Sequence, residues 1–244
     1  MEQTTTGSYR VLPGRDDDEW LLLDVERGDP TYVPRTDGDR TDDGRADTTA
    51  LAPGNRIDAT LEWVDGDPEV ASYEVVDATR FRFARTTEQM FEAATRCWAD
   101  AVERDSGMNS RVTYGTDGEP NGVVYTFAKQ PGQRDLFAEF RDGVKPLEPL
   151  LVRAAGGREA YDAATAGSDA ASDDAAEGEL SAEGRTDDTG ADPPFETFVV
   201  DAADEPFVAV YIVLDPEGFL AETVRDTYLD DAEGDASGGL ADRL

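Results

Sequence analysis

Alternation of apolar and polar residues dominates the first eighty positions and predicts β-strands. In the run RIDATLEWV at 56–64, Ile57, Ala59, Leu61 and Trp63 share one face, and polar residues occupy the other. An Asp-Gly pair follows directly, which is a hairpin signal. Similar apolar or alternating runs lie at 7–12, 19–26, 30–34 and 70–84, separated by turns rich in Gly, Pro and Asp.

These strands favour one β-rich module over residues 1–73, built as a small barrel or a curled sheet, with an OB-like fold as one form. The stretch from about 35 to 50 contains no large apolar residue. We therefore expect a mobile acidic loop there, between the third strand and the run at 56–64.

Helical spacing replaces alternation after the strands. Met90, Ala94, Trp98 and Ala101 recur at intervals of three to four and, with a TTEQ capping box, predict a helix over 86–104. The later pattern predicts strands at 110–115, 122–129, 195–200 and 206–215, helices at 133–141 and 216–229, and a helical turn at 145–157.

Together with a strand at 74–83, these elements follow the order βαββαβ with one strand and one helix added. That order predicts an α+β fold with a ferredoxin-like or related α/β sandwich over residues 74–229, packed with the β-rich module. The stretch 163–194 contains one large apolar residue among many acids, so we expect a disordered acidic insert there. The acidic tail, 230–244, should fray.

Three stretches carry a resemblance to other proteins: MNSRVTY at 108–114, GVVYTFAKQPGQRDLFAEFRDGVKPLEPL at 122–150, and DEPFVAVYIVLDPEGFLAETVRDTY at 204–228. They resemble an uncharacterised haloarchaeal protein family, acidic and salt-adapted. The resemblance covers most of the chain outside the insert and tail. It implies a saline habitat and a shared fold, and it implies no known activity.

The charge balance agrees with that habitat. The chain has 55 acidic and 22 basic residues, a net charge of −33, and only two of the bases are lysine. Molar salt shortens the Debye length to roughly 3 Å and would screen the self-repulsion of such a surface. The acidity therefore indicates habitat rather than a partner.

Composition also excludes several chemistries. The chain has no histidine, which excludes Ser-His-Asp catalysis and His-ligated metals, and Cys97 is its only cysteine, which excludes an intrachain disulfide. No phosphate loop, dinucleotide fingerprint or calcium loop is present, so we expect no cofactor and no metal. The N-terminus lacks a signal-peptide pattern, and no apolar run is long enough to span a membrane, so we expect a cytoplasmic protein without membrane contact.

The middle of the chain escapes this acidity. Residues 79–158 contain 12 bases against 11 acids, whereas the remainder carries a net charge of −34. Burial with ordinary salt bridges is one explanation, since a packed segment needs fewer solvating carboxylates. An anionic ligand received by this region is the other.

The second explanation predicts an RNA or nucleic-acid contact by an accessory protein. TRFRFAR at 79–85 interleaves arginine with phenylalanine, as stacking platforms do. The stretch at 121–128 matches the RNA-recognition consensus poorly. It is compatible with the nucleic-acid hypothesis but is no evidence for it. The expected contacts to phosphates or bases are Arg80, Arg82, Arg111, Lys129 and Arg134, with Tyr125 and Phe127 as stacking residues.

Two other functions use the same region. A protein partner could dock on the less acidic face, especially if the helix at 133–151 exposed apolar side chains. Alternatively, Lys129 could act as base or nucleophile in a semi-buried pocket, because lysine can lose its proton whereas arginine cannot. The sequence leaves the oligomeric state open.

Overall fold

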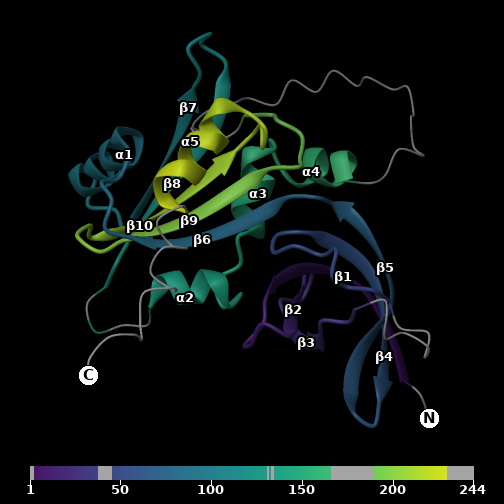
Figure 1. Cartoon of the computed structure of the whole chain (residues 1–244). Helices are drawn as coiled ribbons and strands as arrows, with labels where there is room; N and C mark the ends of the chain where they lie inside the picture. Colours follow the sequence, from purple (N-terminus) through teal and green to yellow (C-terminus); the bar gives the residue numbers. More distant parts are fainter. Residues whose placement is uncertain (1–2, 38–45, 131, 133–134, 166–188, 230–244) are drawn as a thin grey trace, which may run out of the picture. The chain divides into compact units, whose positions relative to one another are not determined.

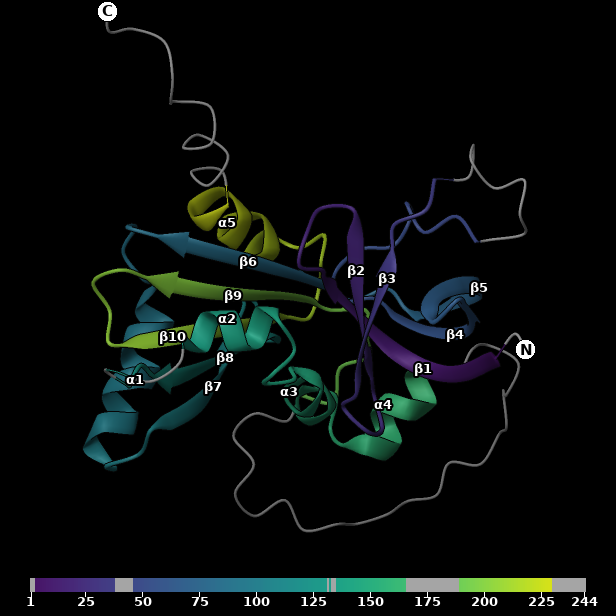
Figure 2. The same ribbon diagram turned by 90° about the horizontal axis from the view of Figure 1, so that it is seen from below.

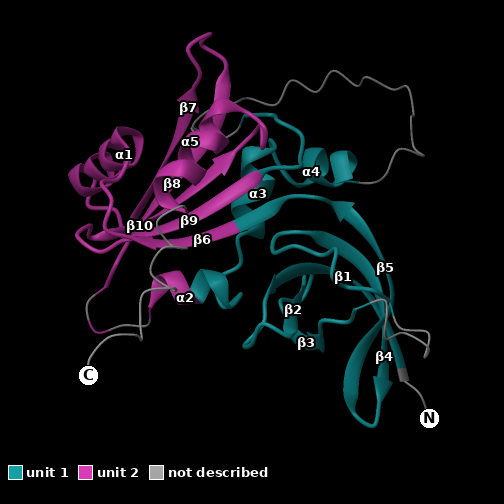
Figure 3. Ribbon diagram, viewed as in Figure 1, with its two compact units in different colours: residues 1–81, 139–195 teal, residues 82–138, 196–244 magenta. Residues whose placement is uncertain are grey.

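The computed structural model describes residues 3–37, 46–130, 132, 135–165 and 189–229. The chain is a mixed α+β protein with two five-stranded, mostly antiparallel sheets (Figure 1). It divides into two compact units, each discontinuous in sequence (Figure 3). Unit 1 comprises Met1–Phe81 and Glu139–Phe195, and unit 2 comprises Arg82–Ala138 and Glu196–Leu244.

The sheet of unit 1 is antiparallel throughout, in the order β3-β2-β1-β4-β5. Short Gly- and Asp-containing turns join neighbouring strands, as the sequence pattern predicts. The elements of this unit are β1 (Gln3–Pro13), β2 (Glu19–Asp24), β3 (Pro30–Pro34), β4 (Arg56–Val64), β5 (Asp67–Asp77), α3 (Glu148–Ala154) and α4 (Arg158–Thr165).

This sheet curls without closing into a barrel, which corrects one of the two expected forms. The loop after β3 links the edges: the Ala46 amide donates to the Val70 carbonyl at 3.0 Å, and the Thr48 amide donates to the Thr36 carbonyl at 3.0 Å. Hydrogen bonds thus hold residues 46–48 of the stretch expected to be mobile, and residues 38–45 of that stretch lie outside the described residues. The concave face buries a core of Tyr9, Val11, Trp20, Leu22, Val33, Leu51, Ile57, Ala59, Leu61 and Val70.

The opposite face of the same sheet is also covered. Leu12, Leu21 and Leu23 point to it and are buried, because β2 is apolar at nearly every position. Gly143, with φ +71°, approaches so closely that a Cβ atom there would lie 2.8 Å from Leu12 Cδ1. The segment that carries α3 and α4 therefore packs directly on this face.

Unit 2 contains the second sheet, in the order β6-β9-β10-β8-β7 (Figure 2). The Arg80 amide bonds the Phe195 carbonyl and the Ala203 amide bonds the Thr86 carbonyl, so β6 and β9 run parallel, while the other strand pairs are antiparallel. Its elements are β6 (Arg80–Thr86), α1 (Glu92–Glu103), β7 (Met108–Tyr114), β8 (Pro120–Ala128), α2 (Leu136–Arg141), β9 (Glu196–Ala202), β10 (Phe207–Val213) and α5 (Phe219–Tyr228); the boundary between units falls within β6 and α2.

The strand β10 occupies the centre of this sheet because it is apolar on both faces and buried at every position. Helices α1 and α5 cover one face (Figure 1). The core on that face includes Ala94 and Cys97 from α1, Tyr211 from β10, and Val224 and Tyr228 from α5.

The strand order differs from that of a ferredoxin-like fold. In that fold the first strand lies between the third and the fourth, whereas here β6 is an edge strand and β10 takes the central place. The middle of the sheet is buried on both faces, which suits the apolar strand β10. The strand β6 carries three arginines and lies at the edge, where they can reach solvent. The sandwich is thus a related α+β arrangement.

Two element boundaries also differ from the predictions. The strand expected at 74–83 is broken, because the Asp77 carboxylate accepts the Thr79 amide at 2.8 Å and turns the chain between β5 and β6. The helix expected from Thr86 begins at Glu92, since Thr86 ends β6 and its hydroxyl accepts the Glu88 amide in a local turn.

The predicted acidic insert and tail fall mostly outside the described residues. Of 163–194, residues 166–188 are not described, and neither is the tail at 230–244. At the ends of the insert, α4 runs to Thr165, and the Thr189 hydroxyl donates to the Ala154 carbonyl at 2.7 Å. Helices at 139–165 belong to unit 1, whereas the sequence-based division grouped them with residues 74–229.

Candidate functional site

A buried arginine organises the covered face of the unit 1 sheet. The Arg10 guanidinium donates from Nε and Nη2 to Glu148 Oε2, at 2.9 and 2.7 Å. Its Nη1 donates to Asp77 Oδ2 at 3.1 Å and to the Gly54 carbonyl, and its Nη2 also donates to Tyr161 Oη at 2.6 Å. Arg10, Asp77, Glu148 and Tyr161 are each at most 8% exposed. We call these four residues and the Gly54 carbonyl the Arg10 network.

Charge keeps the arginine ionised in this setting. Burial by itself would lower the pKa of Arg10, but Glu148, Tyr161 and Asp77 outweigh it and raise the pKa well above its ordinary value. Burial is the first cause that raises the pKa of Tyr161, so its phenol stays protonated and donates to Asp77 Oδ2 at 2.7 Å. One cation therefore faces two carboxylates, and the network has a formal charge of −1.

Local backbone geometry places the partners of Arg10. Gly54 has φ +97°, and a Cβ atom there would lie 2.5 Å from the Phe81 amide nitrogen, so only glycine lets this turn approach β6. The Phe81 amide donates to the Pro53 carbonyl at 2.7 Å, which fixes the turn that presents the Gly54 carbonyl. Glu148 opens α3, 138 positions along the chain from Arg10.

One polar atom of the network has no partner. Glu148 Oε2 accepts two hydrogen bonds from Arg10, whereas Glu148 Oε1 is buried and accepts none among the described residues. A buried acceptor left without a bond costs about 1–3 kcal/mol, so such atoms call for an explanation.

A pocket of about 230 Å³ is lined in part by Arg10 and Glu148 of the network. Its walls are largely apolar, and Arg10, Asp24 and Glu148 are its buried charged residues. The lining comprises Arg10, Leu12, Leu23, Asp24, Val25, Glu26, Arg27, Gly28, Phe81, Phe140, Pro146, Leu147, Glu148, Pro149 and Arg158, all of unit 1.

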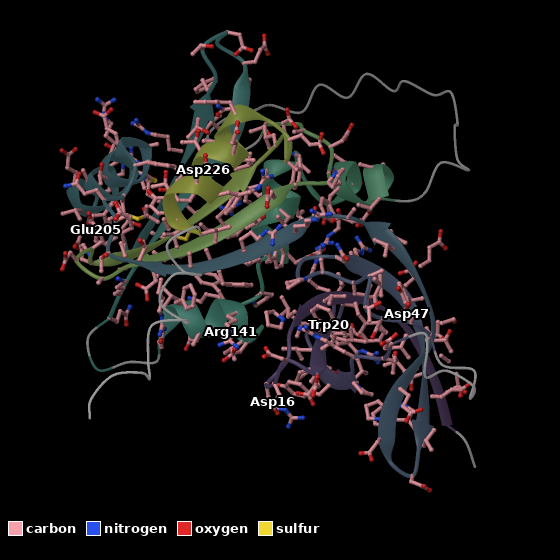
Figure 4. All side chains as sticks on the ribbon, viewed as in Figure 1. Asp16, Trp20, Asp47, Arg141, Glu205 and Asp226 are labelled. Atoms are coloured by element: carbon pink, nitrogen blue, oxygen red, sulfur yellow. The ribbon has the colours of Figure 1, made fainter. Side chains whose placement is uncertain are left out.

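The predicted residue Lys129 lies elsewhere and has a structural environment. Its ammonium group donates to the carbonyls of Ala202 and Glu205, at 2.6 and 2.9 Å, and pairs with Asp201 at 2.6 Å. These bonds tie the end of β8 to the turn between β9 and β10, where Figure 4 labels Glu205. Three acceptors match the three N–H groups of a lysine, which leaves none for a substrate or a phosphate.

Two predicted arginines of unit 2 are paired with carboxylates. Arg82 contacts Glu196 at 3.1 Å, and the buried Glu196 also binds Arg225. Arg111 contacts Asp100 at 3.1 Å. Each of these two arginines is thus engaged by a neighbouring acid.

The other predicted contacts are brought together only in part. Tyr125 is fully buried, so its expected role as a stacking residue is wrong: a base cannot reach a ring enclosed by the core. Phe127 is half-buried, with its ring 6.4 Å from that of Tyr125. Arg80 is exposed, and Arg134 lies outside the described residues.

Sequence reasoning missed the Arg10 network, although a signal for it exists. The run WLLLD at 20–24 is apolar at four consecutive positions, which indicates a strand covered on both faces. Arg10 lies opposite Leu23 in the neighbouring strand, so its side chain must face a covered surface and requires buried carboxylates. No local pattern marks Glu148 as the partner.

Other features of the described residues bear on the class of site. No helix in the described part of the chain is long and apolar enough to cross a membrane. Within the same residues, no cluster of three or more acidic or cysteine side chains is arranged to hold a metal ion.

Comparison with known proteins gives a family and no activity. None of the curated proteins compared with the chain matches it. The model described as "Family of unknown function (DUF6663)" matches residues 1–234. Because this match spans nearly the entire sequence, the chain belongs to the family of unknown function DUF6663.

Proposed function

We propose that this protein binds a small molecule in the pocket beside the Arg10 network. The observation that carries the proposal is a largely apolar cavity of about 230 Å³ whose lining includes Arg10 and Glu148 of this buried network. Ligand pockets combine apolar walls with a few fixed polar groups in this way. Two hydrogen bonds from Arg10 hold Glu148 in place, so this wall of the pocket is fixed before a ligand arrives.

A screen of small fragments by ligand-observed NMR would test this proposal. The Val25→Trp variant fills the pocket from its wall, since Val25 lines the pocket and is half-buried. Val75→Trp is the matched control, because Val75 is 42% exposed on β5 and does not line the pocket. We expect fragments that bind the wild type and Val75→Trp and fail to bind Val25→Trp. Fragments that bind all three proteins equally, or none at all, would contradict the proposal.

Nucleic-acid contact stays a prediction, and fewer of the expected contact residues are accessible than the sequence suggested. Of the expected contacts, Arg80 is exposed without an ion-pair partner among the described residues, and Phe127 is half-buried. Arg82, Arg111 and Lys129 would first have to leave their carboxylates. Ultraviolet crosslinking to RNA at native salt would test it, with an Arg80→Ala, Arg82→Ala, Lys129→Ala variant for comparison. Absence of a crosslink in the wild type would refute it.

Docking of a protein partner on the same region also stays a prediction. Val144 is 61% exposed just after α2, and it is the kind of apolar side chain that such docking requires. Val102, Met108 and Tyr114 are also exposed in this region. Scattered exposed apolar side chains are common on protein surfaces, so they favour this function less than the pocket favours a small molecule.

A further inference from the structure

The edges of the two sheets differ in how well they are protected. The first sheet ends in β3 and β5, and the second ends in β6 and β7 (Figure 2). An edge strand presents a row of unpaired N–H and C=O groups, which can pair with a strand of another molecule. Proteins prevent such pairing with prolines, charged side chains, bulges or a covering loop. Three of these four edges carry such protection, and β7 differs from them.

Proline, charge and loop contacts protect the other three edges. The strand β3 begins and ends at a proline, and β5 carries four acids within eleven residues. The Ala46 amide of the loop after β3 donates to the Val70 carbonyl of β5 at 3.0 Å. In the second sheet, β6 carries three arginines, and its Phe81 amide donates to the Pro53 carbonyl at 2.7 Å. A further strand would have to displace these groups.

The edge at β7 lacks this protection over most of its length. Residues 108–113 contain no proline, and their one charged side chain, Arg111, pairs with Asp100. The irregularity in the pairing of β7 with β8 falls after Thr113, near the end of the strand. Every residue of β7 is at least partly exposed, and among the described strands it pairs with β8 alone.

The register of β7 and β8 shows which backbone groups of this edge point outward. The Ala128 amide donates to the Gly107 carbonyl at 2.8 Å, and these two residues continue the register of the strand pair. Bonded positions alternate along an antiparallel pair, so the odd-numbered positions from 109 to 113 bond to β8. The amides and carbonyls of Ser110 and Val112 therefore face away from β8, with no other described strand beside them.

Charge indicates what kind of strand fits this edge. No acid lies between Asp105 and Asp117, although the chain has 55 acids among 244 residues. Two copies with a net charge of −33 each repel one another least where acids are absent. The edge is also complementary to itself, because opposite residues of an antiparallel pair exchange one donor and one acceptor each. A two-fold axis, the commonest symmetry of protein oligomers, brings identical strands together in this antiparallel way.

We infer that two copies of the chain associate through β7, which pairs antiparallel with β7 of the second copy. The backbone groups of Ser110 and Val112 supply the hydrogen bonds between the copies. Met108 and Tyr114, 37% and 62% exposed near the two ends of the strand, add apolar surface. The inference goes beyond the proposed function, because it uses a sheet edge of unit 2 and no residue of the pocket.

Sedimentation equilibrium in molar potassium chloride, over a wide range of protein concentration, tests the association. The Ser110→Lys variant places a lysine on the edge, where lysine opposes strand pairing. Ser72→Lys is the matched control, because Ser72 is an exposed serine on the protected strand β5. We expect wild type and Ser72→Lys to form dimers with similar dissociation constants. Ser110→Lys should raise the dissociation constant at least about tenfold.

Hydrogen exchange followed by NMR locates the contact. The amides of Ser110 and Val112 should exchange more slowly in wild type as protein concentration rises, and should exchange rapidly in Ser110→Lys. The amides at 109, 111 and 113 should stay protected by β8 in both proteins, which shows that the variant is folded.

Two results would overturn the inference: a wild type that is monomeric at every concentration, or a dimer that Ser110→Lys weakens no more than Ser72→Lys. If Ser110→Lys fails to fold, the two outward amides of wild type still decide, because exchange that is independent of concentration contradicts pairing through β7. The fragment screen tests the pocket separately, so either proposal can fail without the other.

Discussion

The two units handle their charged groups in different ways. In unit 1, Arg10 is enclosed with Asp77 and Glu148, and each of the three is at most 8% exposed. In unit 2, the cations of the main ion pairs stay partly in solvent: the Arg82 side chain is 42% exposed and that of Arg111 41%. Figure 4 shows side chains with carboxylate oxygens spread over both units.

This difference separates two roles for charge in one acidic chain. Solvent and salt screen a partly exposed pair such as that of Arg111 with Asp100, so the pair contributes little to stability. The Arg10 network is desolvated, so removing any member leaves a buried group without its partner. A partly exposed pair therefore tolerates replacement, whereas the enclosed network joins segments that are far apart in the sequence.

Replacement of Arg10 should lower the free energy of unfolding more than any other change predicted here. Arg10→Met leaves two carboxylates buried without a cation, and we expect it to lower the free energy of unfolding by about 3–5 kcal/mol. Arg56→Met is the control, because Arg56 lies opposite Arg10 in the next strand and pairs at 3.3 Å with Asp162, whose side chain is 45% exposed. It should cost about 1 kcal/mol or less.

Chemical denaturation in molar potassium chloride, followed by tryptophan fluorescence, measures both variants. Similar losses for Arg10→Met and Arg56→Met would show that the enclosed network contributes no more than a partly exposed pair, and would remove the basis of the comparison.

Removal of the Tyr161 hydroxyl should give an intermediate effect with a characteristic pH dependence. Tyr161→Phe deprives Asp77 and Arg10 of one bond each, which should cost about 1–3 kcal/mol at neutral pH. Because burial raises the pKa of Tyr161 above its ordinary value of 10.0, the unfolded chain loses this proton before the folded one. Wild-type stability should therefore fall as pH rises above 10.

The variant lacks the phenol and so lacks this part of the alkaline slope. The gap in stability between wild type and Tyr161→Phe should narrow above pH 10, as measured by denaturation at a series of pH values. A gap that stays constant would show that the phenol titrates normally in the folded chain.

The ion pairs of unit 2 should give the smallest effects. Lys129→Met removes one ion pair and two bonds to carbonyls from a side chain that is 29% exposed, and should cost about 1–2 kcal/mol. Arg111→Ala removes a single pair and should cost less than about 1 kcal/mol. Denaturation at low and molar salt should show the Arg111 effect shrinking as salt rises. An effect of Lys129→Met as large as that of Arg10→Met would contradict the contrast between the units.

Much of the fold follows from local patterns. Alternation at 56–64 predicted β4, and the run at 206–215 predicted the strand β10. The apolar residues of β10 on both faces suit its central place, where both faces are buried. Turns rich in glycine and aspartate marked the hairpins. Local patterns did not predict the order of strands in the second sheet. Whether β6 or β10 lies at the centre depends on the packing of all five strands together.

The candidate site was less predictable. Lys129 was singled out because lysine is rare in this chain, yet its ammonium group holds the turn between β9 and β10. Charge neutrality at 79–158 was visible in the sequence, whereas the pairing of Arg82 with Glu196 and of Arg111 with Asp100 was not.

By itself, the sequence determined the secondary-structure types, the acidic character and the exclusion of histidine and disulfide chemistry, because these depend on residue identity and on periodicity along a short stretch. The tertiary structure alone decided that Arg10 meets Glu148, 138 positions away, and that both residues line one pocket. The physical reason is that burial and hydrogen-bond satisfaction are properties of the surroundings, and the surroundings of Arg10 come from segments that no local pattern connects.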